Sequence, residues 1–307
     1  MDDDHGQIRY IALAFLVTFL WASSFIIIKF GLRGLSPLLF AGYRYILASA
    51  ILLVASLRNK TTRNELFSLS SRSWGIYGTY GLIFIAITQG TGFLSLKLLP
   101  AVTVSFVLSL TIIFVILISD ITLGERPTKK QFAFIILALV GVLIFFYPLS
   151  VIVENKVGLL ILVISLLANA ISTIMGRGIN RSDTTPVIVI TTVSMGIGAI
   201  ALLIAAAIFE GFEMPSLIEL VIIVWLAVVN TALTFTIWNY VLRKLTAYEA
   251  TVIQNSMLPQ ITILAIIFLG EKVTWYQDIA IVIILVSVVL VQLNNGVKKV
   301  NEKSEIT

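Results

Sequence analysis

The feature that most constrains this chain is a series of apolar runs, each about as long as a helix that crosses a lipid bilayer. Such a helix needs about 20 mainly apolar residues. The 307-residue sequence holds ten candidates, at residues 11–28, 37–57, 74–94, 101–121, 129–147, 157–175, 186–209, 217–241, 249–269 and 275–293. Because backbone groups in hydrocarbon must pair within their own segment or in a closed barrel, and these runs do not alternate as barrel strands do, we expect helices.

The composition agrees with a protein whose main solvent is lipid. Of the residues, 59% are hydrophobic and 12% are charged, against about 45–50% apolar and about 25% charged in an average soluble domain. The first run follows the acidic leader Met1-Asp2-Asp3-Asp4, whereas a cleaved signal begins with basic residues, so the run is expected to remain as the first helix. The sequence therefore predicts an all-α membrane protein with ten transmembrane helices.

Lysine and arginine fall mostly into alternate connections between the runs, and this bias predicts the orientation of the chain. Cytoplasmic loops carry an excess of these residues. One side holds most of the 21 basic residues, among them Arg58, Lys60, Arg63, Arg72, Arg126, Lys129, Lys130, Arg177, Arg181, Arg243 and Lys244. We therefore expect both termini in the cytoplasm and the protein in the cell membrane. The net charge of +5 is explained by these loops, and no nucleic-acid partner is expected.

The sequence contains a second, similar copy of residues 97–131. Shifted by 146 positions, they align without a gap on residues 243–277, so that Lys97 meets Arg243 and the Leu-Gly-Glu that ends at Glu125 meets the Leu-Gly-Glu that ends at Glu271. A match at a fixed offset is the signature of an internal repeat. More weakly, at an offset of 148, Lys29 and Arg33 meet Arg177 and Arg181.

The repeat sets the expected architecture. Each copy holds five runs, an odd number, so the second copy enters the membrane from the opposite face. The sequence thus predicts two inverted five-helix repeats, residues 1–148 and 149–307, with the Leu-Gly-Glu corners on opposite faces. Inverted repeats recur in transporters, whose sites lie near the bilayer midplane where the halves meet.

The sequence resembles the drug/metabolite transporter superfamily, specifically proteins made of two EamA domains. The resemblance covers nearly the whole chain and rests on several motifs together: residues 21–25 (WASSF), 40–45 (FAGYRY), 98–101 (LLPA) and both Leu-Gly-Glu ends. It implies a carrier of small metabolites, with a cavity lined by helices one to four and six to nine, and with helices five and ten at the periphery. The halves differ, since Pro259 aligns with Ile113 and Arg44 has no basic counterpart in the seventh run, so symmetric roles are not carried across.

Polar side chains inside the runs are costly in lipid and mark candidate binding residues. Ser105 and Ser109 in the fourth run match Thr251 and Asn255 in the ninth. They form either a substrate-binding wall or bonds that hold helices together. The further candidates are Trp21 in the first run, Gln89 in the third, Asn169 in the sixth, and Asn230 and Trp238 in the eighth. For Trp238, a place in an interfacial aromatic belt is the alternative.

Arg44 is the one strongly charged residue well inside a run, and Tyr43 and Tyr45 flank it. A guanidinium always carries charge and matches a carboxylate or phosphate. It either binds an anionic group of the substrate or reaches the headgroups and nearby helix ends. Glu125 and Glu271 end helices, and a structural tie to a neighbouring loop is the favoured role for them.

Several site classes are disfavoured by the sequence. It has no cysteine, its one histidine is His5 in the leader, and no Gly-x-x-x-x-Gly-Lys-Ser/Thr motif is present, so we expect neither a metal site nor a nucleotide cofactor. No carboxylate lies in the middle of a run, which favours facilitated diffusion or exchange, with coupling through Asp120 or Glu249 left open.

The sequence therefore predicts a secondary transporter that moves a small-molecule substrate across the lipid bilayer. Amino acids or related zwitterions are the favoured class of substrate. An intramembrane enzyme and a non-transporting membrane scaffold remain the alternatives. Assembly as a homo-oligomer is compatible with the sequence.

Overall fold

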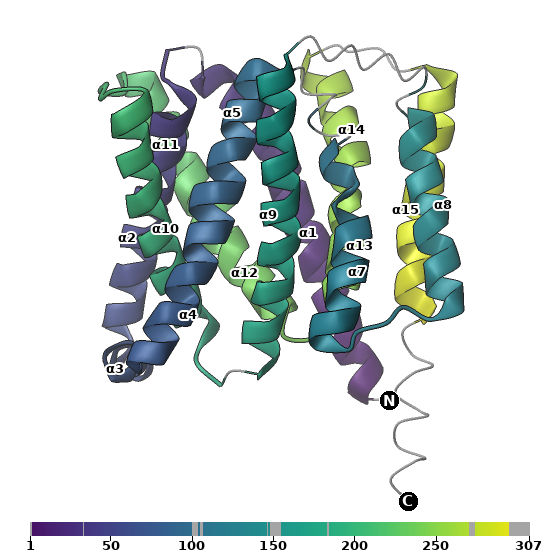
Figure 1. Ribbon diagram of the computed structural model, residues 1–307, viewed down its shortest axis with the longest axis horizontal. Helices are drawn as coiled ribbons and strands as arrows, with labels where there is room; N and C mark the ends of the chain where they lie inside the picture. The colour runs from purple at the N-terminus through teal and green to yellow at the C-terminus, as the bar shows by residue number, and fades with distance from the viewer. Residues whose placement is uncertain are drawn as a thin grey trace, which may run out of the picture.

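The computed structural model describes residues 2–32, 34–99, 104, 107–145, 147, 155–182, 184–269 and 274–294. Within these residues the chain is all-α (Figure 1). The first half contains α1 (Asp2–Gly31), α2 (Pro37–Arg58), α3 (Lys60–Ser68), α4 (Ser71–Gly81), η1 (Leu82–Gln89), α5 (Gly90–Leu98), α7 (Thr111–Leu123) and α8 (Lys129–Phe145). The second half contains α9 (Lys156–Ser182), α10 (Val187–Phe209), α11 (Leu217–Ala227), η2 (Val228–Leu233), α12 (Thr234–Val241), α13 (Ala247–Asn255), α14 (Met257–Leu269) and α15 (Trp275–Leu293).

Eight helical stretches of the described chain are long and apolar enough to cross a membrane. They account for eight of the ten predicted runs. The two remaining runs, 101–121 and 129–147, contain the shorter helices α7 and α8. The all-α membrane class is therefore confirmed, and the ten-helix arrangement stays a prediction.

Local sequence explains where several helices begin and end. Pro37 opens α2, where its missing N–H costs little. Ser216 and Thr246 each begin a helix with a capping box, in which a Glu three residues later binds back to the cap. Gly124 ends α7 with φ of +65°, the left-handed angle that glycine adopts without strain. The prediction that the Leu-Gly-Glu motif ends a helix is confirmed for the first copy.

The ninth run is broken where the sequence predicted one helix. α13 ends at Asn255 and α14 begins at Met257. Pro259 lies in the first turn of α14, and proline cannot donate to the carbonyl four residues earlier, which is that of Asn255. The single helix expected over 249–269 is therefore two segments that meet at Ser256.

Two π-helical segments interrupt the third and eighth runs. η1 and η2 begin at residues 82 and 228, which are 146 positions apart, the offset of the repeat. In each, a threonine hydroxyl donates to the carbonyl five residues earlier: Thr88 to Ile83 and Thr231 to Leu226, both at 2.8 Å. A π segment shifts the register of the backbone bonds and releases carbonyls, so both halves carry the same irregularity.

The long helices run side by side in a bundle, with α8 and α15 as a pair at one edge (Figure 1). α8 packs against α15 at one edge, which agrees with the implied peripheral place of helices five and ten. Elsewhere α10 packs against α2 and α4. A Cβ atom added to Gly81 would lie 1.9 Å from the backbone oxygen of Ser194, and one added to Gly198 would lie 2.4 Å from that of Gly81. α4 and α10 therefore touch through their backbones.

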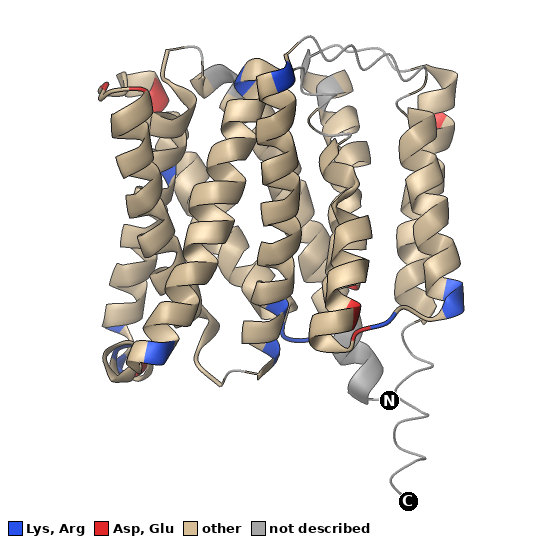
Figure 2. Ribbon diagram, viewed as in Figure 1, with Lys and Arg blue, Asp and Glu red and all other residues tan. Residues whose placement is uncertain are grey.

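Basic side chains gather at the end of the bundle where α1 begins (Figure 2). This end, called the basic end below, holds α3, the starts of α4 and α8 and the ends of α2, α7 and α9. By these bounds it carries Arg58, Lys60, Arg63, Arg72, Arg126, Lys129, Lys130 and Arg181. The opposite end, called the far end, carries Lys97 and Lys156 among the described residues. This asymmetry is the one that the sequence predicted.

Candidate functional site

A cavity of about 420 Å³ lies between the helices of the two halves. It extends from Trp21 and Phe235, at mid-depth, toward Leu32 and Leu96, near the far ends of α1 and α5. Helices α1, α2, α5, α9, α12, α13 and α14 line it, together with η1 and the residues that precede α7. Both halves therefore contribute to one chamber within the apolar bundle.

Six of the residues predicted as a site line this cavity together: Trp21, Arg44, Gln89, Ser109, Asn169 and Asn255. They come from six different parts of the chain, and only the packing of the two halves brings them to one chamber. The other predicted residues that the structure describes lie elsewhere. Ser105 lies outside the described residues.

Arg44 is a buried cation held by neutral partners. Its side chain is 3% exposed. Nε donates to the hydroxyl of Thr231 at 2.6 Å, and Nη2 donates to the backbone oxygen of Asn230 at 3.0 Å. Both acceptors lie in η2, where the π register leaves a carbonyl available. The guanidinium carbon lies 5.5 Å from the ring centre of Tyr45.

No acidic side chain of the described chain lines the cavity or pairs with Arg44. The guanidinium has five N–H donors, and the described bonds engage Nε and Nη2 only. The N–H groups of Nη1 therefore remain able to donate to a ligand in the cavity that Arg44 lines. A carboxylate or phosphate brought by a ligand matches both the geometry and the missing charge.

Aromatic rings form the inner floor of the cavity. Trp21 Nε1 donates to the hydroxyl of Thr234 at 3.1 Å, which joins α1 to α12. The Trp21 ring packs against Phe235 and Trp238, with ring centres 5.4 and 5.2 Å apart. Phe84 meets Phe235 at 5.1 Å. Each of these rings packs against at least one other, so this end of the cavity is largely apolar.

Amide side chains supply the neutral polar part of the wall. Asn255 Nδ2 donates to the backbone oxygen of Ser109 at 3.4 Å, which is a long bond. Gln89, Asn169 and Gln254 line the cavity and make no side-chain hydrogen bond to any residue that the structure describes. An amide offers two donors and an acceptor, so these groups can bind either charged end of a small zwitterion.

Four predicted residues do not line the cavity. The hydroxyl of Tyr43 donates to the backbone oxygen of Glu213 at 2.7 Å, near the far end. Asn230 Nδ2 donates to the backbone oxygen of Leu20 and to Ser23.

The other two of the four are almost fully buried in the packing. Trp238 is 2% exposed and packs behind Trp21. Thr251 is 1% exposed and donates to Ala247 within its own helix. In all four residues the polar or aromatic group contacts another helix, a loop or its own backbone instead of the chamber.

Sequence reasoning did not single out Ser165 or the ring pair of Phe84 and Phe235. Ser165 lines the cavity and donates to the backbone oxygen of Thr88, in η1, at 3.1 Å. The π segments were the missing information, because they decide which carbonyls and rings face inward. The sequence signal for the π segments is a threonine within an apolar run in each half, Thr88 and Thr231.

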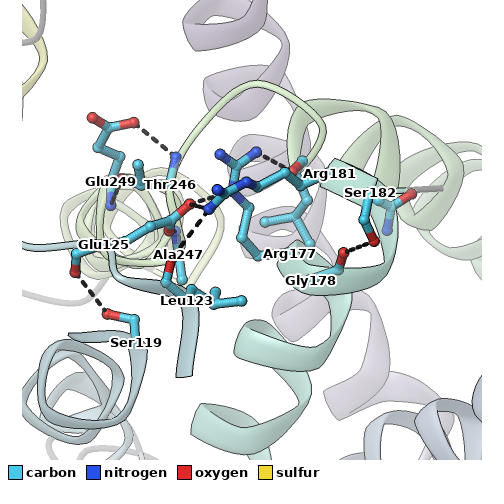
Figure 3. A network of polar contacts seen from close by, with 12 residues as sticks. Ser119, Leu123, Glu125, Arg177, Gly178, Arg181, Ser182, Thr246, Ala247 and Glu249 are labelled. Carbon is cyan, nitrogen blue, oxygen red and sulfur yellow. Dashed lines mark hydrogen bonds and ion pairs between the residues drawn. The ribbon is translucent and has the colours of Figure 1, made fainter. Parts of the chain in front are cut away.

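A second polar cluster, called the Glu125 cluster, joins the two halves at the basic end (Figure 3). Glu125 Oε1 accepts from Arg177 Nε at 2.7 Å and from Arg181 at 3.3 Å. Glu125 Oε2 accepts from the backbone N–H of Ala247 at 2.9 Å, and so caps α13. Arg177 also donates to the backbone oxygen of Leu242 at 2.8 Å, after α12. The prediction that Glu125 ties its helix end to a neighbour is confirmed.

Comparison with known proteins identifies the family. The model of the EamA-like transporter family matches residues 8–147 and 156–293. The chain is 27% identical over 298 residues to a probable amino-acid metabolite efflux pump of Escherichia coli, covering 89% of this chain and 91% of that protein. It is 30% identical over 275 residues to an uncharacterised transporter of Archaeoglobus fulgidus, covering 87% and 92%.

A solved crystal structure of another protein has the same fold. It superposes with a TM-score of 0.77 over 93% of this chain and 96% of that one, at 17% identity. The match spans both halves of the molecule. Three findings point to the same class of protein. The chain has two family domains in tandem, its long apolar helices can span a membrane, and its relatives are named as transporters. The chain therefore belongs to the EamA-like transporter family and is a multi-pass membrane transporter.

Proposed function

We propose that this protein is a secondary transporter that carries a small metabolite across the cell membrane by alternating access. The observation that carries the proposal is the chamber between the halves. It is polar in part, it lies within an apolar bundle, and both family domains contribute to its wall. Such a chamber, reached in turn from the two faces of the membrane, is what an inverted-repeat carrier needs.

The arrangement in the membrane belongs to the same proposal. Ten helices form two inverted five-helix repeats, with α7 and α8 as the fourth and fifth and α15 as the tenth. The basic end faces the cytoplasm because it carries the excess of lysine and arginine. The chamber of the described state lies toward the far end, which is then the outer face.

The substrate class that fits the chamber best is an amino acid or a related zwitterion. Arg44 supplies a fixed positive charge for a carboxylate, and the amides of Gln89, Asn169 and Asn255 supply oxygens for an ammonium group. The aromatic floor suits an apolar side chain. The printed name of the Escherichia coli relative, an amino-acid metabolite efflux pump, is consistent with this class.

Flux into liposomes tests the proposal. The purified protein is reconstituted into liposomes without nucleotide. The liposomes are loaded with labelled candidate amino acids, and the release of each labelled solute is followed. We expect saturable flux that competing solutes inhibit. Chemical conversion of the solute would instead support an intramembrane enzyme. A protein that neither moves nor converts any solute in the panel would contradict the proposal and favour a scaffold.

A further inference from the structure

The chamber lies toward the far end of the bundle, whereas the Glu125 cluster lies at the basic end of some of the same helices. On α9, Asn169 lines the chamber and Arg177 belongs to the cluster, eight residues or about 12 Å further on. On α13, Asn255 and Ala247 have the same separation. Glu125 follows the end of α7, and Ser109, which lines the chamber, lies two residues before the start of α7. α7 packs against both α9 and α13, so the cluster joins, at the basic end, three helices whose other parts reach the chamber.

The bonds that the Glu125 carboxylate accepts all run between the two halves. Glu125 belongs to the first family domain, whereas Arg177, Arg181, Leu242 and Ala247 belong to the second. Leu123, also of the first domain, accepts from Arg181 at 3.2 Å. A movement of one half against the other must break this set of bonds together.

Ionic bonds at a membrane surface are suited to repeated breaking. When a buried ion pair separates, water solvates both charges, so the loss of attraction is largely offset by hydration. Arg181 is 50% exposed while Glu125 and Arg177 are 6% and 9% exposed, so water already reaches the rim. An apolar seal of similar size would instead expose hydrocarbon to water on every opening. The cluster is therefore compatible with two states of similar free energy.

We propose that the Glu125 cluster is the gate that closes the chamber at the basic end, with Glu125, Arg177 and Arg181 as positioning residues for the transport cycle. The inference rests on the proposed function, since a gate has meaning only in a carrier. The proposal differs from a permanent structural tie, because the cluster is formed in the state that is closed at the basic end and broken in the state that is open there. Weakening the cluster then favours the state that is open at the basic end.

Cysteine labelling measures the two states without a known substrate, because the chain contains no cysteine of its own. Ser172 lies on α9 between Asn169 and Arg177 and is 1% exposed, so a Ser172→Cys thiol is shielded from an aqueous reagent in the described state, and we expect it to react faster when the basic end opens. A membrane-impermeant maleimide is applied to vesicles with the basic end outward. In the Glu125→Gln variant we expect the labelling rate to rise about tenfold.

Two further variants make the result decisive. Glu65→Gln removes an acidic group of α3 that is outside the cluster, and it should leave the labelling rate unchanged. Arg181→Gln removes the two longer bonds of the more exposed arginine, to Leu123 at 3.2 Å and to Glu125 at 3.3 Å, and it should raise the labelling rate by less than Glu125→Gln does. Arg181→Gln decides the question if the Glu125→Gln protein does not reach the membrane.

A probe in the chamber separates a gate from local loosening. Leu96 lines the chamber near the far end, and Leu96→Cys should be labelled from that face. In the double variant Glu125→Gln, Arg181→Gln, far-end labelling of Leu96→Cys should fall by about half or more, because the far end closes as the basic end opens. A rise at Ser172→Cys without this fall, or no rise, would overturn the gate. Absence of flux together with the reciprocal labelling would instead count against the proposed function alone.

Discussion

Arg44 is the residue whose charge most distinguishes the chamber. Its described partners are a hydroxyl and a carbonyl, so the guanidinium is solvated by the protein but not neutralised by it. In the proposed function, a ligand carboxylate would supply the missing charge in a buried site, where the attraction between charges is stronger than in water. The same bonds also hold α2 to η2, so Arg44 has a structural role beside the recognition role that we propose for it.

Replacing Arg44 by glutamine separates these two roles. The amide retains one hydrogen-bond donor group toward Thr231 or Asn230 but loses the charge. We expect transport of carboxylate-bearing solutes to fall by about tenfold or more, since a charge-assisted bond contributes about 1.5–3 kcal/mol. Neutral solutes should be affected much less. Equal losses for charged and neutral solutes in the same liposome assay would show that Arg44 acts only on structure.

Asn255 is the second residue to test, because it lines the chamber beside the break between α13 and α14. Asn255→Leu keeps the volume but removes both donors and the acceptor. We expect flux to be lost while the thermal unfolding temperature changes little, since its one bond, to Ser109, is long. Thr262→Val is the matched control on α14, because among the described residues the Thr262 hydroxyl bonds only to the backbone oxygen of Leu258 and does not line the chamber. Unchanged kinetics in Asn255→Leu would remove this residue from the site.

The π segment η2 is the element that positions Arg44. Thr231 accepts from Arg44 and donates to Leu226, so Thr231→Val leaves a buried guanidinium N–H without an acceptor. We expect a loss of about 1–3 kcal/mol in the free energy of unfolding. Thr236→Val is the control, because Thr236 bonds only to Ala232. If the two variants melted at the same temperature in detergent, the bond to Arg44 would not hold this element.

The contact between α4 and α10 depends on two glycines without side chains. Gly198→Ala would place a methyl group 2.4 Å from the backbone oxygen of Gly81, so the two helices must move apart. Gly196→Ala, on the same helix, meets nothing within 4 Å. We expect the first variant to unfold at a clearly lower temperature and the second to match the parent or exceed it. Equal unfolding temperatures would show that the bundle adapts at this crossing.

Hydrophobicity predicts helices well, and it predicts their irregularities poorly. The apolar runs anticipated the long helices of the described chain, and Leu-Gly-Glu anticipated the end of α7 at Gly124. They did not anticipate α3 within the polar connection after residue 58, because that helix is short and capped locally by Asn59. Nor did they anticipate η1 and η2, since a π register changes backbone bonds without changing the apolar pattern.

The irregularities explain why the site could be predicted only in part. Polar residues such as Asn169 and Asn255 were found because polarity is rare in lipid. Which of them face the chamber is decided by tertiary packing. Asn230 and Thr251 looked equivalent to them in sequence, yet one ties η2 to α1 and the other bonds within α13.

At the scale of the whole molecule, one duplication explains the paired features. The π segments begin at the repeat offset, and both family domains contribute to one chamber. The Glu125 cluster bonds one half to the other at the basic end. A carrier made of two similar halves in opposite orientations has two states that resemble each other, one open to each face, and can move a solute without a nucleotide.

The inverted arrangement is the central claim, and the sidedness of the two Leu-Gly-Glu corners tests it most directly. Arg126 and Lys272 follow the two corners and are 146 positions apart. Each is replaced by cysteine, the only one in its chain, and intact cells are treated with an impermeant thiol reagent. The account predicts that Lys272→Cys is labelled from outside and Arg126→Cys only after the membrane is opened. Labelling of both positions from the same side would contradict it.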